Sequence, residues 1–312
     1  MPPISKKRTV FQRQGDPYLY LYAEREWYCY NPNDDPLGSG AMGTVWRGYR
    51  VKTGEPIAVK RVKDEYVNIP IIRERARLES SMAFRHQNLI EMIGCCMVHP
   101  DKGPIWLLSK FVSGMEIDKL ANQLPEGQPK VETISRCICQ VLDALEYIHA
   151  NGIIHRDIKP SNIMVEEDSN ARLMDLGIAR MSGGNKFSQT GFIGTPQYAA
   201  PEQITRDFNS LIPINAATDI YALGVTFYEL LTGVNPFDSE SEMETLTRQL
   251  RDPLPKSDMI PKRLMQVLMK ATEKEQPKRY QSAAEFRQAI RTAIGPEPTF
   301  WERLINRLSR KP

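Results

Sequence analysis

The chain has 312 residues, of which 41% are hydrophobic and 25% charged, and its formal net charge is +3. These values are ordinary for a globular protein, and the length suits one large domain or two small ones. So small a net charge, without a concentrated basic stripe, argues against a nucleic-acid partner. No apolar run approaches the roughly 20 residues of a transmembrane helix. The five cysteines lack zinc-site spacing, so we expect reduced thiols in a cytoplasmic protein.

The first half of the chain is predicted to be rich in strands. Short apolar runs at 44–49 and 56–60, separated by the turn Thr53-Gly54-Glu55, predict two strands of a sheet. Charged residues that favour helix predict a helix over 70–84, and residues 105–108 predict another strand.

The second half is predicted to be helical. Apolar residues recur at helical spacing over 133–150, and 218–231 is apolar almost all round, as in a buried central helix. Two further helices are expected near 261–272 and 282–294, before Gly295-Pro296 interrupts the pattern.

These patterns divide the chain into segments. We expect an N-terminal extension without clear period at 1–26, a sheet-rich lobe at about 27–109, a connection at 110–114, a helical lobe at 115–294, and a tail at 295–312.

One short run combines the groups that phosphoryl transfer needs. His155-Arg156-Asp157-Ile158-Lys159-Pro160-Ser161-Asn162 is followed by Asp175-Leu176-Gly177. One carboxylate can accept the proton of an attacking hydroxyl, and the lysine can neutralise phosphate charge. The amide and the second carboxylate can hold Mg²⁺.

A glycine-rich segment, Gly38 to Val45, precedes this run. Glycines at this spacing let backbone N–H groups approach a phosphate closely, although a flexible hairpin would look the same. Lys60 lies in the next apolar strand, where burial would require an anionic partner; the alternative is an exposed lysine on an edge strand.

Together these motifs resemble the eukaryotic-like (Hanks-type) protein kinases over residues 28–294. Lys159, two residues after Asp157, is similar to the serine/threonine-specific branch, and the runs at 194–198 and 200–203 resemble most the bacterial members. The resemblance implies an α+β, two-lobed fold with a small antiparallel-sheet lobe carrying one long helix and a larger, mainly helical lobe. It also implies an enzyme that transfers the γ-phosphate of ATP to protein hydroxyls. ATP and Mg²⁺, or Mn²⁺ in its place, are the cofactors implied.

The resemblance assigns roles to the motif residues. Asp157 would accept the hydroxyl proton, Lys159 would contact the γ-phosphate, and Asn162 with Asp175 would hold the metal ion. Leu176 replaces the usual phenylalanine after the metal-binding aspartate, which leaves that ligand intact. The ATP-binding positions implied are Gly38, Ser39, Gly40, Ala41, Met42, Gly43, Val45, Ala58, Lys60, Lys110 and Val112.

Lys60 is expected to pair with a glutamate on the first long helix. Glu74 is the first choice, Glu79 is the alternative, and a surface pairing of Glu74 with Arg77 is also open. Between the lobes, Ser109 aligns with the position behind the adenine, unless the register is shifted by one residue to Leu108.

The segment from Ala179 to Glu202 resembles an activation segment. Thr195 would bond the catalytic aspartate and lysine, and Arg156 would receive an activation-loop phosphate. The enzyme is expected to autophosphorylate this segment at Thr190 or Ser188, and Ser182 is a further candidate site. Asp219 would support the catalytic-loop backbone, and Arg279 would form a buried ion pair with Glu202.

The tail has Trp301, Leu304, Ile305 and Leu308 at helical spacing, opposite a basic face. Docking on the helical lobe, a membrane surface and a partner protein all remain open for 299–312. For the whole chain, a catalytically weak pseudokinase scaffold and a small-molecule kinase are the alternatives to a protein kinase.

Overall fold

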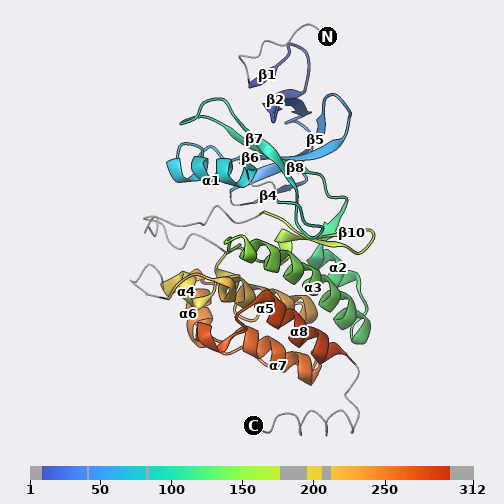
Figure 1. Cartoon of the computed structure of the whole chain (residues 1–312), viewed down its shortest axis with the longest axis vertical. Helices are drawn as coiled ribbons and strands as arrows, with labels where there is room; N and C mark the ends of the chain where they lie inside the picture. The colour runs from blue at the N-terminus through green and yellow to red at the C-terminus, as the bar shows by residue number, and fades with distance from the viewer. Residues whose placement is uncertain (1–8, 41, 82–83, 176–194, 206–211, 296–312) are drawn as a thin grey trace.

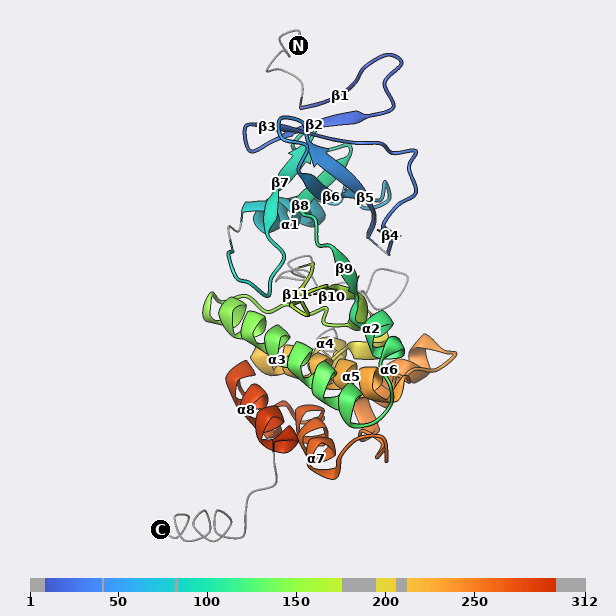
Figure 2. The same ribbon diagram turned by 90° about the vertical axis from the view of Figure 1, so that its right-hand side faces the viewer.

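A computed structural model of the chain describes residues 9–40, 42–81, 84–175, 195–205 and 212–295. They form two lobes, a sheet with one long helix above and a mainly helical lobe below (Figures 1 and 2). This is the α+β fold class expected from the sequence.

The N-terminal lobe is built on an antiparallel sheet with the strand order β1-β2-β3-β5-β6-β8-β7, in which β4 also pairs with β5. The helix α1 packs against β7 and β8. The elements are β1 (Val10–Gln12), β2 (Leu19–Ala23), β3 (Glu26–Tyr30), β4 (Gly38–Ser39), β5 (Gly43–Arg50), β6 (Pro56–Val62), α1 (Pro70–Ser81), β7 (Met92–Met97) and β8 (Ile105–Lys110).

The two faces of this sheet bury different side chains, because successive residues of a strand point to opposite faces. One face forms a cluster of Leu21, Ala23, Tyr28, Tyr30, Ile57, Val59, Cys96, Trp106 and Leu108. On the other face, Val62, Ile105 and Leu107 cluster with Ala76 of α1 and with Val67, which lies between β6 and α1. Lys60 pairs with Val45 on β5 and Leu107 on β8, so it lies on the face of α1.

Two of the strands, β1 and β2, lie in the range that the sequence assigns to an N-terminal extension. The sequence analysis found no clear period there, whereas the structure pairs β1 with β2 and β2 with β3. Alternate residues of β2 enter the core, and Leu21 is fully buried. On the other face, Phe11 stacks on Tyr20 with ring centroids 4.9 Å apart. The sheet therefore begins well before residue 27.

The C-terminal lobe is mainly helical, with a small sheet of order β11-β10-β9 at its top. Among the helices that the structure describes, none combines the length and hydrophobicity of a membrane span. The elements are β9 (Gly114–Glu116), α2 (Ile117–Gln123), α3 (Gln128–Ala150), η1 (Pro160–Asn162), β10 (Ile163–Glu166), β11 (Ala171–Leu173), η3 (Pro196–Tyr198), α4 (Pro201–Thr205), α5 (Ala216–Thr232), α6 (Glu242–Arg251), α7 (Lys262–Ala271), η5 (Gln276–Lys278) and α8 (Ala283–Ile294).

The helix α5 is the centre of this lobe, as its nearly continuous apolar sequence predicts. Asn215 caps its start, accepting a hydrogen bond from the N–H of Ala217, and Gly233 ends it in the left-handed conformation at φ 76°. Most of its side chains are buried, in contact with α2, α3, α7 and α8. Gly224 allows this close packing, since a Cβ there would lie 2.9 Å from the Thr272 side chain.

The predicted helices and strands are present, with shifted ends. The helix predicted at 70–84 ends at Ser81 in the structure, and the one predicted at 133–150 begins earlier, at Gln128. The sequence analysis did not predict β7 or α6, although α6 proves to contact the turn η3.

A buried ion pair joins α4 to the segment before α8. Arg279 and Glu202 are almost fully buried. The Nη1 and Nη2 of Arg279 donate to the Oε1 and Oε2 of Glu202, at 2.8 Å and 2.9 Å. Burial would raise the pKa of Glu202, but the hydrogen bonds and charge of Arg279 lower it below its usual value. Thr218 and Gln276 donate two further bonds to the carboxylate, so it has the partners that a buried charge requires.

The role of β2 in the core is tested by Leu21→Ala. Because Leu21 is fully buried, we expect urea denaturation to show a free energy of unfolding lower by about 2–5 kcal/mol. Leu37 is 52% exposed, so the matched control Leu37→Ala should cost about 0.5 kcal/mol or less. Equal losses would contradict a core role for β2.

The ion pair is tested by Arg279→Leu, which leaves the Glu202 carboxylate buried without its charged partner. We expect a loss of about 3–5 kcal/mol in the free energy of unfolding, and partial recovery when Glu202→Met is added. Lys278→Met, which removes an exposed ion pair with Glu275, is the control and should change little. A single variant as stable as wild type would show that the pair does not stabilise the fold.

Candidate active site

The glycine-rich segment forms a strand–turn–strand hairpin. Gly38 pairs with Val45 across β4 and β5, and the N–H of Gly40 donates to the carbonyl of Gly43 at 2.9 Å. Only glycine fits at position 43, because the Cβ of any other residue would lie 2.5 Å from the carbonyl oxygen of Arg61. Ala41 lies outside the described residues. A strand follows the turn, in contrast to the helix of a dinucleotide-binding fold.

Lys60 and Asp175 join the two lobes. The Nζ of Lys60 on β6 lies 2.6 Å from the Oδ2 of Asp175, which follows β11. Burial would raise the pKa of Asp175, but the Lys60 ammonium outweighs this and lowers it. Asp175 adopts φ 45°, a conformation that costs free energy and tends to be kept at functional sites. Two residues 115 apart in sequence are thus joined in one charged centre.

Two glutamates of α1, Glu74 and Glu79, are the candidates to pair with Lys60. Glu74 is exposed on α1, and the ion pair that the structure shows for Lys60 is with Asp175. Helical spacing puts position 79 on the face of Ile72 and Ala76, which packs toward the sheet. The side chain of Glu79 itself is not among those described, so the pairing with Glu74 stays a prediction that its exposure does not favour.

The catalytic loop is held in place by Asp219 of α5. The buried Asp219 carboxylate accepts hydrogen bonds from the backbone N–H groups of His155 at 2.8 Å and Arg156 at 2.7 Å. Arg156 adopts φ 65°, so these bonds support a strained backbone. His149 Nε2 lies 2.8 Å from the same carboxylate. The sequence analysis missed His149, whose only signal is its place in the last turn of the helix before the loop.

His155 is fully buried and links the loop to the segment that is predicted to bind the metal ion. Its Nδ1 accepts a hydrogen bond from the N–H of Asp157 at 3.3 Å, and its Nε2 donates to the carbonyl of Met174 at 3.0 Å. Because a carbonyl can only accept, the proton lies on Nε2. His155 therefore fixes Asp157 relative to the residue that precedes Asp175.

The polar side chains of the loop converge on Asp157. Thr195 Oγ1 donates to Asp157 Oδ1 at 3.2 Å and accepts from Lys159 Nζ at 3.0 Å. Lys159 Nζ also lies 3.4 Å from Asp157 Oδ2. The Nδ2 of Asn162 donates to the Asp157 carbonyl at 2.7 Å and to its Oδ2 at 3.2 Å. The four predicted side chains thus form one hydrogen-bonded group.

The donor set fits a magnesium ion. The Asn162 Nδ2 is used by Asp157, and no hydrogen bond in the described part of the chain uses its Oδ1. That amide oxygen and the Asp175 carboxylate are the hard ligands that Mg²⁺ prefers. Among the described residues, no group of three or more His, Cys, Asp or Glu side chains could hold a metal alone. An ion here would take further oxygens from phosphates and water.

At the end of β8, before the connection between the lobes, Ser109 and Leu108 lie on opposite faces of the sheet. Ser109 pairs with Ala58 on β6, so it shares the face of Lys60, whereas Leu108 is fully buried in the opposite cluster. The N–H of Lys110 donates to the carbonyl of Glu91 at 2.9 Å. The register in which β8 pairs with β6 therefore favours Ser109 as the residue that faces the space beside Lys60.

Several predicted residues lie outside the described part of the chain. They are the three candidate phosphorylation sites Ser182, Ser188 and Thr190, Leu176 of the metal-binding motif, and the tail 299–312. Arg156 is described, and its carbonyl accepts a hydrogen bond from Gln203 Nε2 at 3.1 Å.

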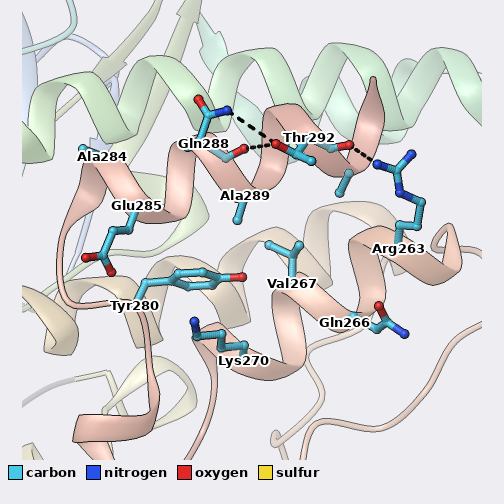
Figure 3. Close-up of a pocket in the computed structure, with 11 residues that line it drawn as sticks. Arg263, Gln266, Val267, Lys270, Tyr280, Ala284, Glu285, Gln288, Ala289 and Thr292 are labelled. Atoms are coloured by element: carbon cyan, nitrogen blue, oxygen red, sulfur yellow. Dashed lines mark hydrogen bonds between the residues drawn. The ribbon is translucent and has the colours of Figure 1, made fainter. Parts of the chain in front are cut away.

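A groove of ≈ 720 Å³ between α7 and α8 is lined by none of the predicted catalytic residues. Tyr280, Val267 and Ala289 lie along it, with Arg263 at one end (Figure 3). The residues predicted to carry the chemistry lie at the junction of the lobes, outside this groove.

Comparisons with known proteins agree with this geometry. A family model described as the protein kinase domain matches residues 32–293. The serine/threonine-protein kinase PknB of Mycobacterium tuberculosis is 32% identical over 272 residues, covering 84% of this chain and 42% of that protein. Pkn1 of Myxococcus xanthus is 33% identical over 272 residues, covering 83% of this chain and 37% of its own length.

This chain thus spans less than half the length of these curated relatives. The crystal structure of the PknI kinase domain of Mycobacterium tuberculosis superposes with a TM-score of 0.64, covering 94% of this chain and 100% of that domain, at 21% identity. At that identity the superposition shows the fold alone. The family match over most of the chain, with its bacterial relatives, means that the chain belongs to the eukaryotic-like (Hanks-type) protein kinase family.

Proposed function

We propose that the chain is an ATP-dependent serine/threonine protein kinase. The observation that carries this proposal is the contact of Asp157 with Lys159, Thr195 and Asn162, beside the Lys60–Asp175 ion pair. Phosphoryl transfer depends mainly on positioning and on neutralising charge, and these side chains supply both.

Asp157 is the group that orients the acceptor hydroxyl and takes its proton. Its Oδ1 and Oδ2 are directed by Thr195 and Asn162, so the carboxylate is pre-oriented before any substrate arrives. Lys159, whose Nζ lies 3.4 Å from Asp157 Oδ2, neutralises charge on the transferred phosphoryl group. Lys60 binds the other phosphates from the sheet side.

Protein kinases use ATP with a divalent metal ion, and we propose Mg²⁺, with Mn²⁺ as a substitute. Asn162 and Asp175 would hold the ion, which neutralises phosphate charge when bound. The hairpin Gly38–Gly43 would cover the phosphates, while Val45 and Ala58 on the strands beside it, and Lys110 and Val112 of the connection, would contact the nucleoside.

Serine and threonine are the proposed acceptors. Lys159, two residues after Asp157, is typical of the serine/threonine-specific branch, and its bond to Thr195 ties it to the segment that would receive the peptide. We further propose a regulatory phosphate on Thr190, Ser188 or Ser182, received by Arg156. A cytoplasmic location and a contact of the tail 299–312 with a membrane or protein stay predictions.

Catalysis is tested by Asp157→Asn. Loss of a catalytic base lowers phosphoryl transfer by on the order of 10²–10⁴, and we expect radiolabel transfer from ATP to fall by that factor. ATP affinity, measured by calorimetry, should stay within about threefold, because Asp157 does not bind the nucleotide. Asp258→Asn removes an exposed carboxylate and is the control. A wild type that binds ATP without transfer would instead identify a pseudokinase scaffold.

The nucleotide pocket is tested with purine inhibitors that carry an enlarged substituent. Because Ser109 is small and faces the same side as Lys60, we expect these inhibitors to bind the wild type, and Ser109→Phe to weaken them by more than about tenfold. The KM for ATP should change little in that variant. Exclusion of the inhibitors by the wild type would assign the position to Leu108.

A further inference from the structure

A chain of buried hydrogen bonds runs from the C-terminal lobe to the turn η3. Gln249 of α6 is fully buried, and its Nε2 donates to the carbonyls of Gln197 at 2.5 Å and Pro196 at 3.3 Å. Its Oε1 accepts from the hydroxyl of Tyr221 on α5 at 2.5 Å. Lys274 Nζ donates in turn to the Tyr221 oxygen at 2.7 Å.

These hydrogen bonds all run in one direction, from Lys274 through Tyr221 and Gln249 to the turn η3. An ammonium can only donate, so Lys274 uses the Tyr221 oxygen as an acceptor. Burial raises the pKa of Tyr221, so its hydroxyl keeps a proton and donates it to Gln249. The Gln249 amide then has one orientation, with its NH₂ group toward the turn. A flipped amide would set Oε1 against two carbonyl oxygens, which is unfavourable in a buried site.

The ammonium group of Lys274 is destabilised by burial. Burial lowers its pKa to about 7, the Arg279 charge acts in the same direction, and Asp252 and Glu273 oppose both. The ring of Phe237, 4.0 Å from Nζ, stabilises the ammonium. Below about pH 7 Lys274 is mostly an ammonium, which can only donate to the Tyr221 oxygen.

The turn η3 is thus held just before its start and at its first two residues. Thr195, just before it, is bonded to the catalytic residues Asp157 and Lys159, and Gln249 holds the next two carbonyls. Because the segment from Ala179 to Glu202 resembles an activation segment, the resemblance also implies that Gly194-Thr195-Pro196 shapes the site for the residue after the acceptor in a peptide. By holding these two carbonyls, Gln249 would therefore set the position of that site relative to Asp157.

We propose that Gln249 is a positioning residue for the peptide substrate, oriented by Tyr221 and Lys274, and that it determines the preference for the residue after the acceptor. The side chain of Gln249 bonds Tyr221 and the carbonyls of Pro196 and Gln197, so it would act through the turn η3. The proposal rests on the protein-kinase function proposed above, and it adds the part of the fold that sets selectivity at one peptide position.

The test is Gln249→Leu, assayed at pH 6.5 with a library of serine- and threonine-centred peptides. We expect the ratio between the best and worst residues after the acceptor to fall about three- to tenfold, as for the loss of one or two buried hydrogen bonds. Preferences three positions before the acceptor, and the KM for ATP, should not change. A merely structural defect would alter all of these together.

Tyr221→Phe removes only the hydroxyl and is the second variant, in case Gln249→Leu does not fold. It should shift the same preference by a smaller factor, and the double variant should lose no more than Gln249→Leu alone. Thr247→Ala, on the exposed face of α6, is the matched control. Unchanged preference in both variants, with an active wild type, would overturn this inference alone. A wild type inactive on every peptide would overturn the proposed function as well.

Discussion

The structure depends above all on the buried carboxylate of Asp219. Its two oxygens hold the N–H groups of His155 and Arg156, and His149 bonds the same group. A buried carboxylate needs such partners, and the loop needs them to keep Arg156 at positive φ. Because α5 is packed on most sides by other helices, the position of the catalytic loop is set by the core of the C-terminal lobe.

From that fixed loop, charge and hydrogen bonds extend in two directions. Toward the sheet, His155 bonds the Met174 carbonyl, and the next residue, Asp175, pairs with Lys60. Toward the peptide side, Asp157 bonds Thr195, and the turn after it is held by Gln249. Nucleotide and acceptor would thus be positioned from one anchor, which is the arrangement that catalysis by positioning requires.

The sequence predicted what local patterns encode. The catalytic loop is contiguous, and α5 is apolar enough to be recognised as buried, so both could be found without a structure. The strand β2 was missed, although Leu19 to Ala23 alternates in burial, because tyrosines on one face obscured the pattern. Gln249 carries no motif at all. Its role arises from contacts with residues 28 and 52 positions away, and long-range pairing of this kind cannot be read from a single sequence.

The most direct measurement is transfer of radiolabelled phosphate from γ-labelled ATP by the wild type and by Asp175→Ala, followed by phosphoamino-acid analysis. Asp175 combines the proposed metal ligand with the ion pair to Lys60, so both parts of the account depend on it. We predict label on serine and threonine with the wild type and a loss of on the order of 10²-fold or more in the variant. Equal labelling by the two proteins, or label on tyrosine alone, would contradict the account.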